Sequence, residues 1–174
     1  MTPSILTIRR ATLSIGLATA LTALPIVAQA QTCPHPGTRP DSRYTLLNND
    51  SEVKDNVTGL IWQRCSLGQT WNGTTCTGTA STYNWQQALT AANALGNGYR
   101  LPNLKELTSL VDDACYNPAI NERMFPNTVS GYYWSSSPVA SDTSYAWGVS
   151  FNDGYTDNNY KSGHNHVRAV RPSQ

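Results

Sequence analysis

The sequence predicts an α+β domain that is held together by two disulfide bonds. Three observations support this fold class. Residues 53–62 have the pattern of a β-hairpin, two apolar stripes with helical spacing begin near residues 84 and 103, and strand-like runs follow residue 130. Both helical stripes are expected to be buried against a sheet.

The first helix is predicted from Asn84 to Leu95 and is ended by the glycines at 96 and 98. Its apolar stripe consists of Trp85, Ala88, Leu89, Ala92 and Leu95. The second helix is predicted to start at Asn103, which can form a capping box with Glu106 three residues later. Its expected buried face consists of Leu104, Leu107, Leu110 and Val111.

Strands are predicted on both sides of the helices. The N-terminal ones are Tyr44–Leu47 and a hairpin that begins at Val53, turns at Asn56–Gly59 and returns through Leu60–Trp62. The C-terminal ones are Tyr132–Ser136, Ala146–Phe151, a return strand from Tyr155 after the turn Asn152–Gly154, and His166–Arg171.

The first 30 residues are typical of a cleavable signal peptide. Arg9 and Arg10 precede an uncharged stretch that ends in Ala28-Gln29-Ala30, the small-residue pattern of a cleavage site. A membrane anchor is the alternative, but interspersed Thr, Ser and Pro residues make the stretch less apolar than a spanning helix. We therefore expect an exported protein, periplasmic, cell-surface or extracellular, with a lead-in at 31–50 and one domain at 51–174.

All four cysteines lie after the expected cleavage site, which indicates two disulfides in an exported chain. Three pairings are open. The turn-rich loop 66–75 favours Cys65 with Cys76, which leaves Cys33 with Cys115. Each bond would stabilise the fold by about 2–4 kcal/mol.

The charge balance argues against two classes of partner. Removing residues 1–30 takes away two basic residues, so 10 basic and 11 acidic residues remain and the formal net charge is −1. A nucleic-acid binder needs a basic face to displace counterions, and a membrane-surface protein needs polybasic segments. Neither partner is expected, and no membrane span should remain after cleavage.

Several motifs resemble one family of bacterial exported proteins. The run Tyr99–Leu107 resembles its signature WRLPT-x-x-EL, Asp55 with Thr58–Trp62 resembles D-x-x-TGL-x-W, and Trp85–Leu89 resembles W-x-x-AL. Further blocks follow in the same order: Phe125–Asn127, Tyr133–Ser137, Ala146–Phe151 and Val167–Arg171. Residues 52–172 are thereby identified as a member of the family typed by the C-terminal domain of the Legionella collagen-like protein.

This resemblance implies a C-type-lectin-like fold, shared with the formylglycine-generating enzyme, in which two helices flank small twisted antiparallel sheets and long loops occupy the C-terminal half. It also implies glycan or surface binding. Because a fold does not by itself determine a function, the site has to be argued from residues.

Aromatic and amide residues are concentrated between 132 and 160, and this composition suits sugars. A pyranose stacks its C–H face on a ring, while amides and carboxylates bind its hydroxyls. The candidate ligand-binding residues are Tyr155, Asp157, Asn158 and Asn159 on the predicted hairpin, together with Trp134 and Trp147. The two tryptophans are favoured for the core because of the large area that a Trp buries.

Arg168 is a further candidate, because arginine binds anionic groups with two parallel hydrogen bonds. With Arg100, Glu106 and Arg171 it could clamp an anion or a sulfated glycan. The alternative, which we favour, is a structural network of ion pairs, since buried Arg and Glu are normally paired.

No cofactor and no metal are expected. Asn152, Asp153, Asp157 and Asn158 carry oxygens that suit calcium, but the lectin signatures EPN or QPD with WND are absent. No catalytic motif is present either. We expect a non-enzymatic domain that binds a glycan or surface polysaccharide. The alternatives are a structural subunit of an envelope assembly and, less favoured, an enzyme related to the formylglycine-generating fold.

Overall fold

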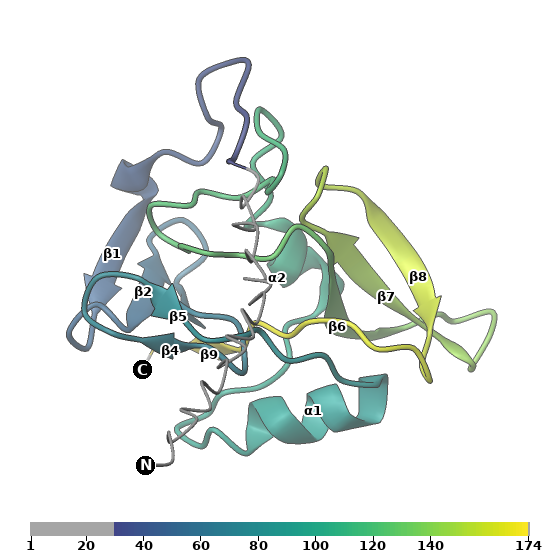
Figure 1. The fold of residues 1–174 in the computed structure, drawn as a ribbon. Coiled ribbons are helices and arrows are strands. Elements are labelled where there is room, and N and C mark those ends of the chain that lie inside the picture. Colours follow the sequence, from purple (N-terminus) through teal and green to yellow (C-terminus); the bar gives the residue numbers. More distant parts are fainter. Residues whose placement is uncertain (1–29, 174) are drawn as a thin grey trace, which may run out of the picture.

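The computed structural model describes residues 30–173, and the predicted signal peptide lies almost wholly outside them. Three small antiparallel sheets and two helices make up the described fold (Figure 1). The elements are the 3-10 turn η1 (Asp41–Arg43), the strands β1 (Tyr44–Leu47), β2 (Glu52–Asp55), β3 (Leu60–Gln63), β4 (Thr70–Trp71), β5 (Cys76–Thr77), β6 (Tyr132–Pro138), β7 (Tyr145–Ser150), β8 (Thr156–Tyr160) and β9 (Val170–Pro172), and the helices α1 (Trp85–Asn93) and α2 (Leu104–Thr108).

The first sheet has the strand order β1-β2-β3-β9. Its register places Leu46, Val53, Trp62 and Val170 opposite one another, so one apolar row crosses all four strands on one face. On the other face Arg171 forms an ion pair with Glu52 at 2.9 Å. The predicted hairpin at 53–62 is confirmed by β2 and β3.

Asp55 fixes the turn of that hairpin. Its carboxylate accepts hydrogen bonds from Arg43, from the backbone N–H of Val57 at 3.0 Å and from the hydroxyl of Thr58 at 2.8 Å. Burial raises the pKa of Asp55, but these donors outweigh burial and hold the pKa below its ordinary value. Asp55 and Thr58 of the motif D-x-x-T therefore serve to hold the hairpin turn together.

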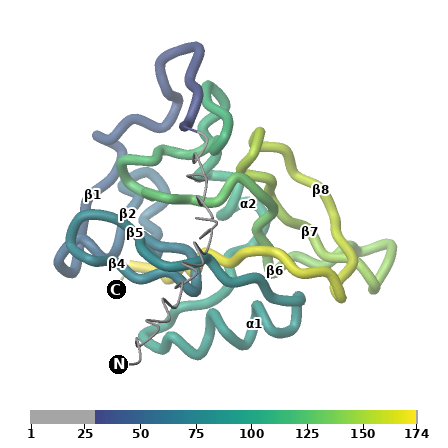
Figure 2. The backbone as a smooth tube through the Cα atoms, viewed as in Figure 1, coloured from purple at the N-terminus to yellow at the C-terminus, as the bar shows by residue number. Residues whose placement is uncertain are grey.

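The sheet β6-β7-β8 separates two hydrophobic clusters. Tyr133 and Val149 belong to one cluster, which also contains the apolar row of the first sheet, whereas Trp134 and Ala146 belong to the other. Ala88 and Ala92 of α1 pack into the second cluster, and Leu107 of α2 packs into the first. The long connection between α2 and β6, green in Figure 2, runs across the molecule between the two larger sheets.

Both helices begin at the predicted residues. Asn84 and Asn103 are N-caps, and each forms a complete capping box with the residue three positions later. The predicted end of the first helix is wrong. α1 stops at Asn93, which leaves Leu95 41% exposed rather than in the core. α2 is a helix of five residues, and Leu110 is buried beyond its end.

The last predicted strand is also shorter than expected. Only Val170–Pro172 pairs with β3, whereas His166 forms an isolated bridge with Tyr133 of the other large sheet. The segment therefore changes partner between 166 and 170. An alternating pattern in the sequence does not report such a change, because each half is still extended.

Both predicted disulfides are confirmed, Cys33 with Cys115 and Cys65 with Cys76. Such bonds indicate a non-cytoplasmic environment. The α+β class is confirmed as well, while the C-type-lectin-like fold stays a prediction. Within residues 30–173, no helix has the length and apolarity needed to cross a membrane.

Replacing Asp55 should destabilise the domain without changing its surface. Asp55→Asn removes the charge that pairs with Arg43 at 2.6 Å and should lower the free energy of unfolding by about 3 kcal/mol. Urea unfolding followed by circular dichroism measures the change. The control is Arg123→Gln, which removes an exposed ion pair with Asp41 and should cost less than about 1 kcal/mol. Equal losses in the two variants would contradict the assigned role of Asp55.

Candidate functional site

The hairpin β7–β8 carries most of the predicted ligand-binding residues, and its register divides them between two faces. Trp147 lies opposite Asn158, and Tyr145 lies opposite Tyr160, so these four side chains share one face of the sheet. Asp157 and Asn159 lie opposite Gly148 and Ala146 and therefore belong to the other face. The sequence grouped these residues as candidates without assigning faces, because the face of each side chain depends on a strand pairing that is not known beforehand.

Tyr145 and Tyr160 lie side by side at one end of the first face. Their ring centroids are 4.2 Å apart with an interplanar angle of 34°, and Tyr160 is 61% exposed. The neighbouring phenol of Tyr160 raises the pKa of Tyr145 to about 12. The phenol of Tyr145 therefore stays neutral at ordinary pH. Trp147 and Asn158 extend this aromatic face along the strands, each half-buried.

Tyr155 lies just before β8 and is 73% exposed. It is accessible, but it stands outside the strand pairs that build the aromatic face. The nearby acidic residues are engaged locally: Asp153 accepts a hydrogen bond from the backbone of Tyr155 at 3.4 Å, and Asp157 accepts one from the backbone of Asn158 at 2.7 Å. Among the described residues, no group of three or more His, Cys, Asp or Glu side chains could hold a metal ion.

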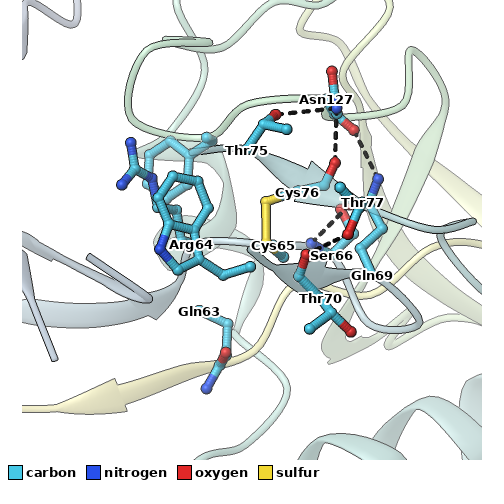
Figure 3. The surroundings of a disulfide bond; sticks show 12 residues. Gln63, Arg64, Cys65, Ser66, Gln69, Thr70, Thr75, Cys76, Thr77 and Asn127 are labelled. Atoms are coloured by element: carbon cyan, nitrogen blue, oxygen red, sulfur yellow. Dashed lines mark hydrogen bonds between the residues drawn. A yellow bond between two sulfur atoms is a disulfide. The ribbon is translucent and has the colours of Figure 1, made fainter. Parts of the chain in front are cut away.

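A second surface, which the sequence did not predict, lies beside the Cys65–Cys76 disulfide. A cavity of about 320 Å³ opens there between the disulfide loop and the end of α1. Figure 3 shows the loop and Asn127, which lies in the connection between α2 and β6 and donates hydrogen bonds to Thr75 at 3.2 Å and to the carbonyl of Cys76 at 2.7 Å. A tryptophan at position 71, among small polar residues in a disulfide loop, was the sequence signal that could have revealed this surface.

The chain matches the model of the Lcl C-terminal domain over residues 51–171. It belongs to that family. No curated protein matches the chain.

In this Lcl C-terminal domain the family motifs build the scaffold. Arg100 forms an ion pair with Glu106 at 2.7 Å, and Glu106 also closes the capping box of α2. Trp134 is completely buried and donates its indole N–H to the carbonyl of Tyr83 at 2.8 Å. Trp134 therefore has no surface with which to contact a ligand, because it fills the second hydrophobic cluster.

Arg168 is completely buried too, and the interpretation of this residue as a ligand clamp has to be corrected. Its guanidinium donates to the carbonyls of Gln63 and Arg64 and to the hydroxyls of Ser66 and Thr128. The predicted ion-pair network is only partly formed, since no acidic side chain within residues 30–173 pairs with Arg168. Burial lowers the pKa of Arg168. The residue ties three segments together inside the Lcl C-terminal domain.

Arg168→Met should therefore act on stability. It leaves the carbonyls of Gln63 and Arg64 without their donor, and two unsatisfied buried acceptors should cost about 2–5 kcal/mol. Thermal unfolding followed by circular dichroism measures the loss. Lys105→Met is the control on an exposed position and should unfold like the unmodified domain. An Arg168→Met variant with an unchanged melting temperature would show that these hydrogen bonds are dispensable.

Proposed function

We propose that this chain is an exported, non-enzymatic domain that recognises a glycan through the aromatic face of β7–β8. The observation that carries the proposal is the stacked pair Tyr145 and Tyr160 on the same face as Trp147 and Asn158. Rings bind the C–H face of a sugar, and an amide donates to and accepts from its hydroxyls. Because side chains alternate between the two faces of β7 and β8, the rings and the amide lie next to one another on the same face.

The charge of this face favours a neutral glycan. The face consists of two phenols, an indole and an amide, and Asp157 belongs to the other face. The carboxylate of Asp142 lies near enough to help raise the pKa of Tyr145, so an anionic ligand would meet repulsion here. Lys161, the next residue after β8, donates to the carbonyl of Thr143 at 2.8 Å and lies over the ring of Trp85 at 4.4 Å. A sulfated sugar would therefore meet no unengaged cation among these residues.

The side chains that could act as nucleophiles already have structural partners, which supports a binding role over catalysis. All four cysteines are in disulfides, so no thiolate is available. The hydroxyl of Ser135 donates to the carbonyl of Trp147 at 2.7 Å, and the hydroxyl of Ser137 accepts from the backbone of Leu104 at 3.0 Å. These serines hold strands and α2 in place.

Export is supported by the way in which the expected mature N-terminus is attached. Gln31 donates its side-chain amide to the carbonyls of Pro118 and Ile120, Thr32 pairs with Tyr116 through two backbone hydrogen bonds, and Cys33 is bonded to Cys115. The fold thus holds the chain from the first residue after the predicted cleavage site. A disulfide at this position also requires an oxidising compartment.

Binding to neutral polysaccharides should depend on the aromatic face. Tyr160→Ala removes the more exposed ring, and a loss of about 1.4 kcal/mol would weaken binding roughly tenfold. Retention on immobilised dextran, mannan and galactan, with and without a chelator, measures the effect. Tyr116→Ala removes another exposed ring, 43% accessible, and should bind normally. If the unmodified domain binds none of these polysaccharides under either condition, the proposal fails.

The export proposal predicts that the signal peptide is cleaved after Ala30. The full chain, produced in a bacterium with an intact export pathway, should yield a protein whose intact mass equals that of residues 31–174. The control is Ala30→Leu, which replaces the small residue needed at the cleavage site and should leave the leader attached. Intact-mass spectrometry distinguishes the two. A natural protein that retains residues 1–30 would contradict the export proposal.

A further inference from the structure

The two disulfides are nested in the sequence. Cys33 is bonded to Cys115, and both cysteines of the other bond, Cys65 and Cys76, lie between them. Cys33 is therefore not joined to the next cysteine along the chain, which is Cys65. An exported chain enters the oxidising compartment with its N-terminus first, so its cysteines arrive in the order of the sequence. The native bonds do not follow that order.

Cys33 meets Cys65 before its native partner is present. In the sequence 32 positions separate Cys33 from Cys65, whereas 82 separate it from Cys115. During the interval before Cys76 arrives, Cys33 and Cys65 are the only two thiols of the chain in the compartment. A protein dithiol oxidase, which takes two electrons from each pair of thiols that it joins, therefore encounters this pair first.

The contacts that place Cys33 come from a late part of the domain. Its neighbour Thr32 forms two backbone hydrogen bonds with Tyr116, both at 2.9 Å. Further along the lead-in, the backbone N–H of Thr38 donates to the carboxylate of Asp112 at 2.8 Å. These partners follow both cysteines of the other bond in the sequence. Cys33 is thus not yet held in its native place when it first meets another thiol.

The local bond between Cys65 and Cys76 has only a modest advantage over the wrong one. Loop entropy favours closing its separation of 11 residues roughly fivefold over closing 32 residues. Its strands β4 and β5 pair two residues each, and such a small two-stranded unit is not stable by itself.

Asn127 secures this disulfide loop, but it comes later in the sequence than all four cysteines. Its side chain donates to the carbonyl of Cys76 at 2.7 Å, and its own carbonyl accepts from Gln69 at 3.1 Å (Figure 3). The loop therefore lacks these hydrogen bonds while the first pairs form. Proximity alone leaves a share of the chains with Cys33 bonded to Cys65.

A chain with the bonds Cys33–Cys65 and Cys76–Cys115 does not fit this fold. The two Cα atoms of a disulfide lie within about 7 Å of one another. In Figure 1 the described chain begins at the top of the molecule, whereas β4 and β5 lie lower and to the left. Cys76 lies opposite Trp71 in the β4–β5 pair, so the wrong bonds would pull both segments out of their places.

Such a chain also has no means of correcting itself. Disulfides exchange only when a thiolate attacks one of the two sulfurs. The sequence contains four cysteines, and two wrong bonds use all of them. The thiolate that starts the exchange therefore has to come from another molecule.

We propose that this chain is a substrate of a disulfide isomerase, a partner protein that presents a reactive thiolate. The proposal rests on the proposed export and not on glycan recognition. The enzyme's thiolate attacks the sulfur of Cys33, which forms a mixed disulfide and releases Cys65 as a thiolate. Cys65 attacks Cys76 and releases Cys115, and Cys115 then attacks Cys33 and releases the enzyme. Two bonds exist before and after, so the exchange transfers no net electrons.

Trypsin separates the native arrangement from both wrong ones. Arg39 precedes a proline and is not cleaved, so one cysteine lies in fragment 31–43, two share fragment 65–100 and one lies in fragment 106–123. In the native pairing, 31–43 is joined to 106–123 and 65–100 is separate. In either wrong pairing, 65–100 is joined to the other fragments. Mass spectrometry of the unreduced digest, after free thiols are blocked, measures the fraction of each form.

The full chain is exported in two strains of one bacterium that differ only in their periplasmic disulfide isomerase. Loss of the isomerase should lower the native fraction roughly threefold or more, and fragment 65–100 should appear joined to 31–43. The purified wrong form should stay unchanged in buffer without thiols. Addition of the isomerase in its dithiol form should convert it to the native linkage.

Cys65→Ser combined with Cys76→Ser is the matched control. This variant can form a single disulfide, so the fraction with 31–43 joined to 106–123 should be the same in both strains. An equal dependence on the isomerase in the variant and in the unmodified chain would overturn the proposal, because mispairing would not be the cause.

Two further outcomes separate this proposal from the proposed function. Equal native fractions of the unmodified chain in the two strains, or conversion of the wrong form without any thiol, would refute the need for an isomerase and leave export and glycan recognition intact. Free thiols in both strains, on a chain that retains residues 1–30, would refute the proposed export and this proposal with it.

Discussion

The buried guanidinium of Arg168 is the contact on which the arrangement of this fold depends. Its direct neighbours Val167 and Ala169 belong to the cluster of α1, whereas Val170, two residues further on, belongs to that of the first sheet. Its donors reach the end of β3 and the loop at Thr128. One side chain therefore joins the two clusters, the four-stranded sheet and the long connection. Apolar packing alone would not specify this arrangement, because it has no direction.

Local signals in the sequence were sufficient for a large part of the fold. The hairpin at 52–63, both capping boxes and both disulfides could be predicted, since each depends on residues close in the chain or on a small number of possible pairings. The predictions failed where the local structure depends on contacts between residues far apart in the sequence. Residues 166–169 leave the strand pattern because His166 pairs with Tyr133, and Leu95 is exposed because α1 ends two residues before it.

The candidate sites show the same division. Trp147 and Asn158 could be recognised as binding chemistry from composition, but which side chains share a face depends on the register with β7. Trp134 and Arg168 lie in family motifs, and the structure explains why such motifs are fixed by packing rather than by a ligand. The cavity beside the Cys65–Cys76 disulfide escaped prediction because its wall is assembled from β3, the disulfide loop and the end of α1.

The disulfide between Cys33 and Cys115 determines how the domain would carry mechanical load. Tension applied through the N-terminus enters at Cys33 and crosses the covalent bond directly to Cys115. Residues 34–114, with β1–β5 and both helices, lie inside the closed loop and are bypassed by the pulling force. The β7–β8 hairpin lies on the strained path. In a molecule pulled between its two ends, the hairpin that carries Tyr145 and Tyr160 would therefore bear load from which residues 34–114 are shielded.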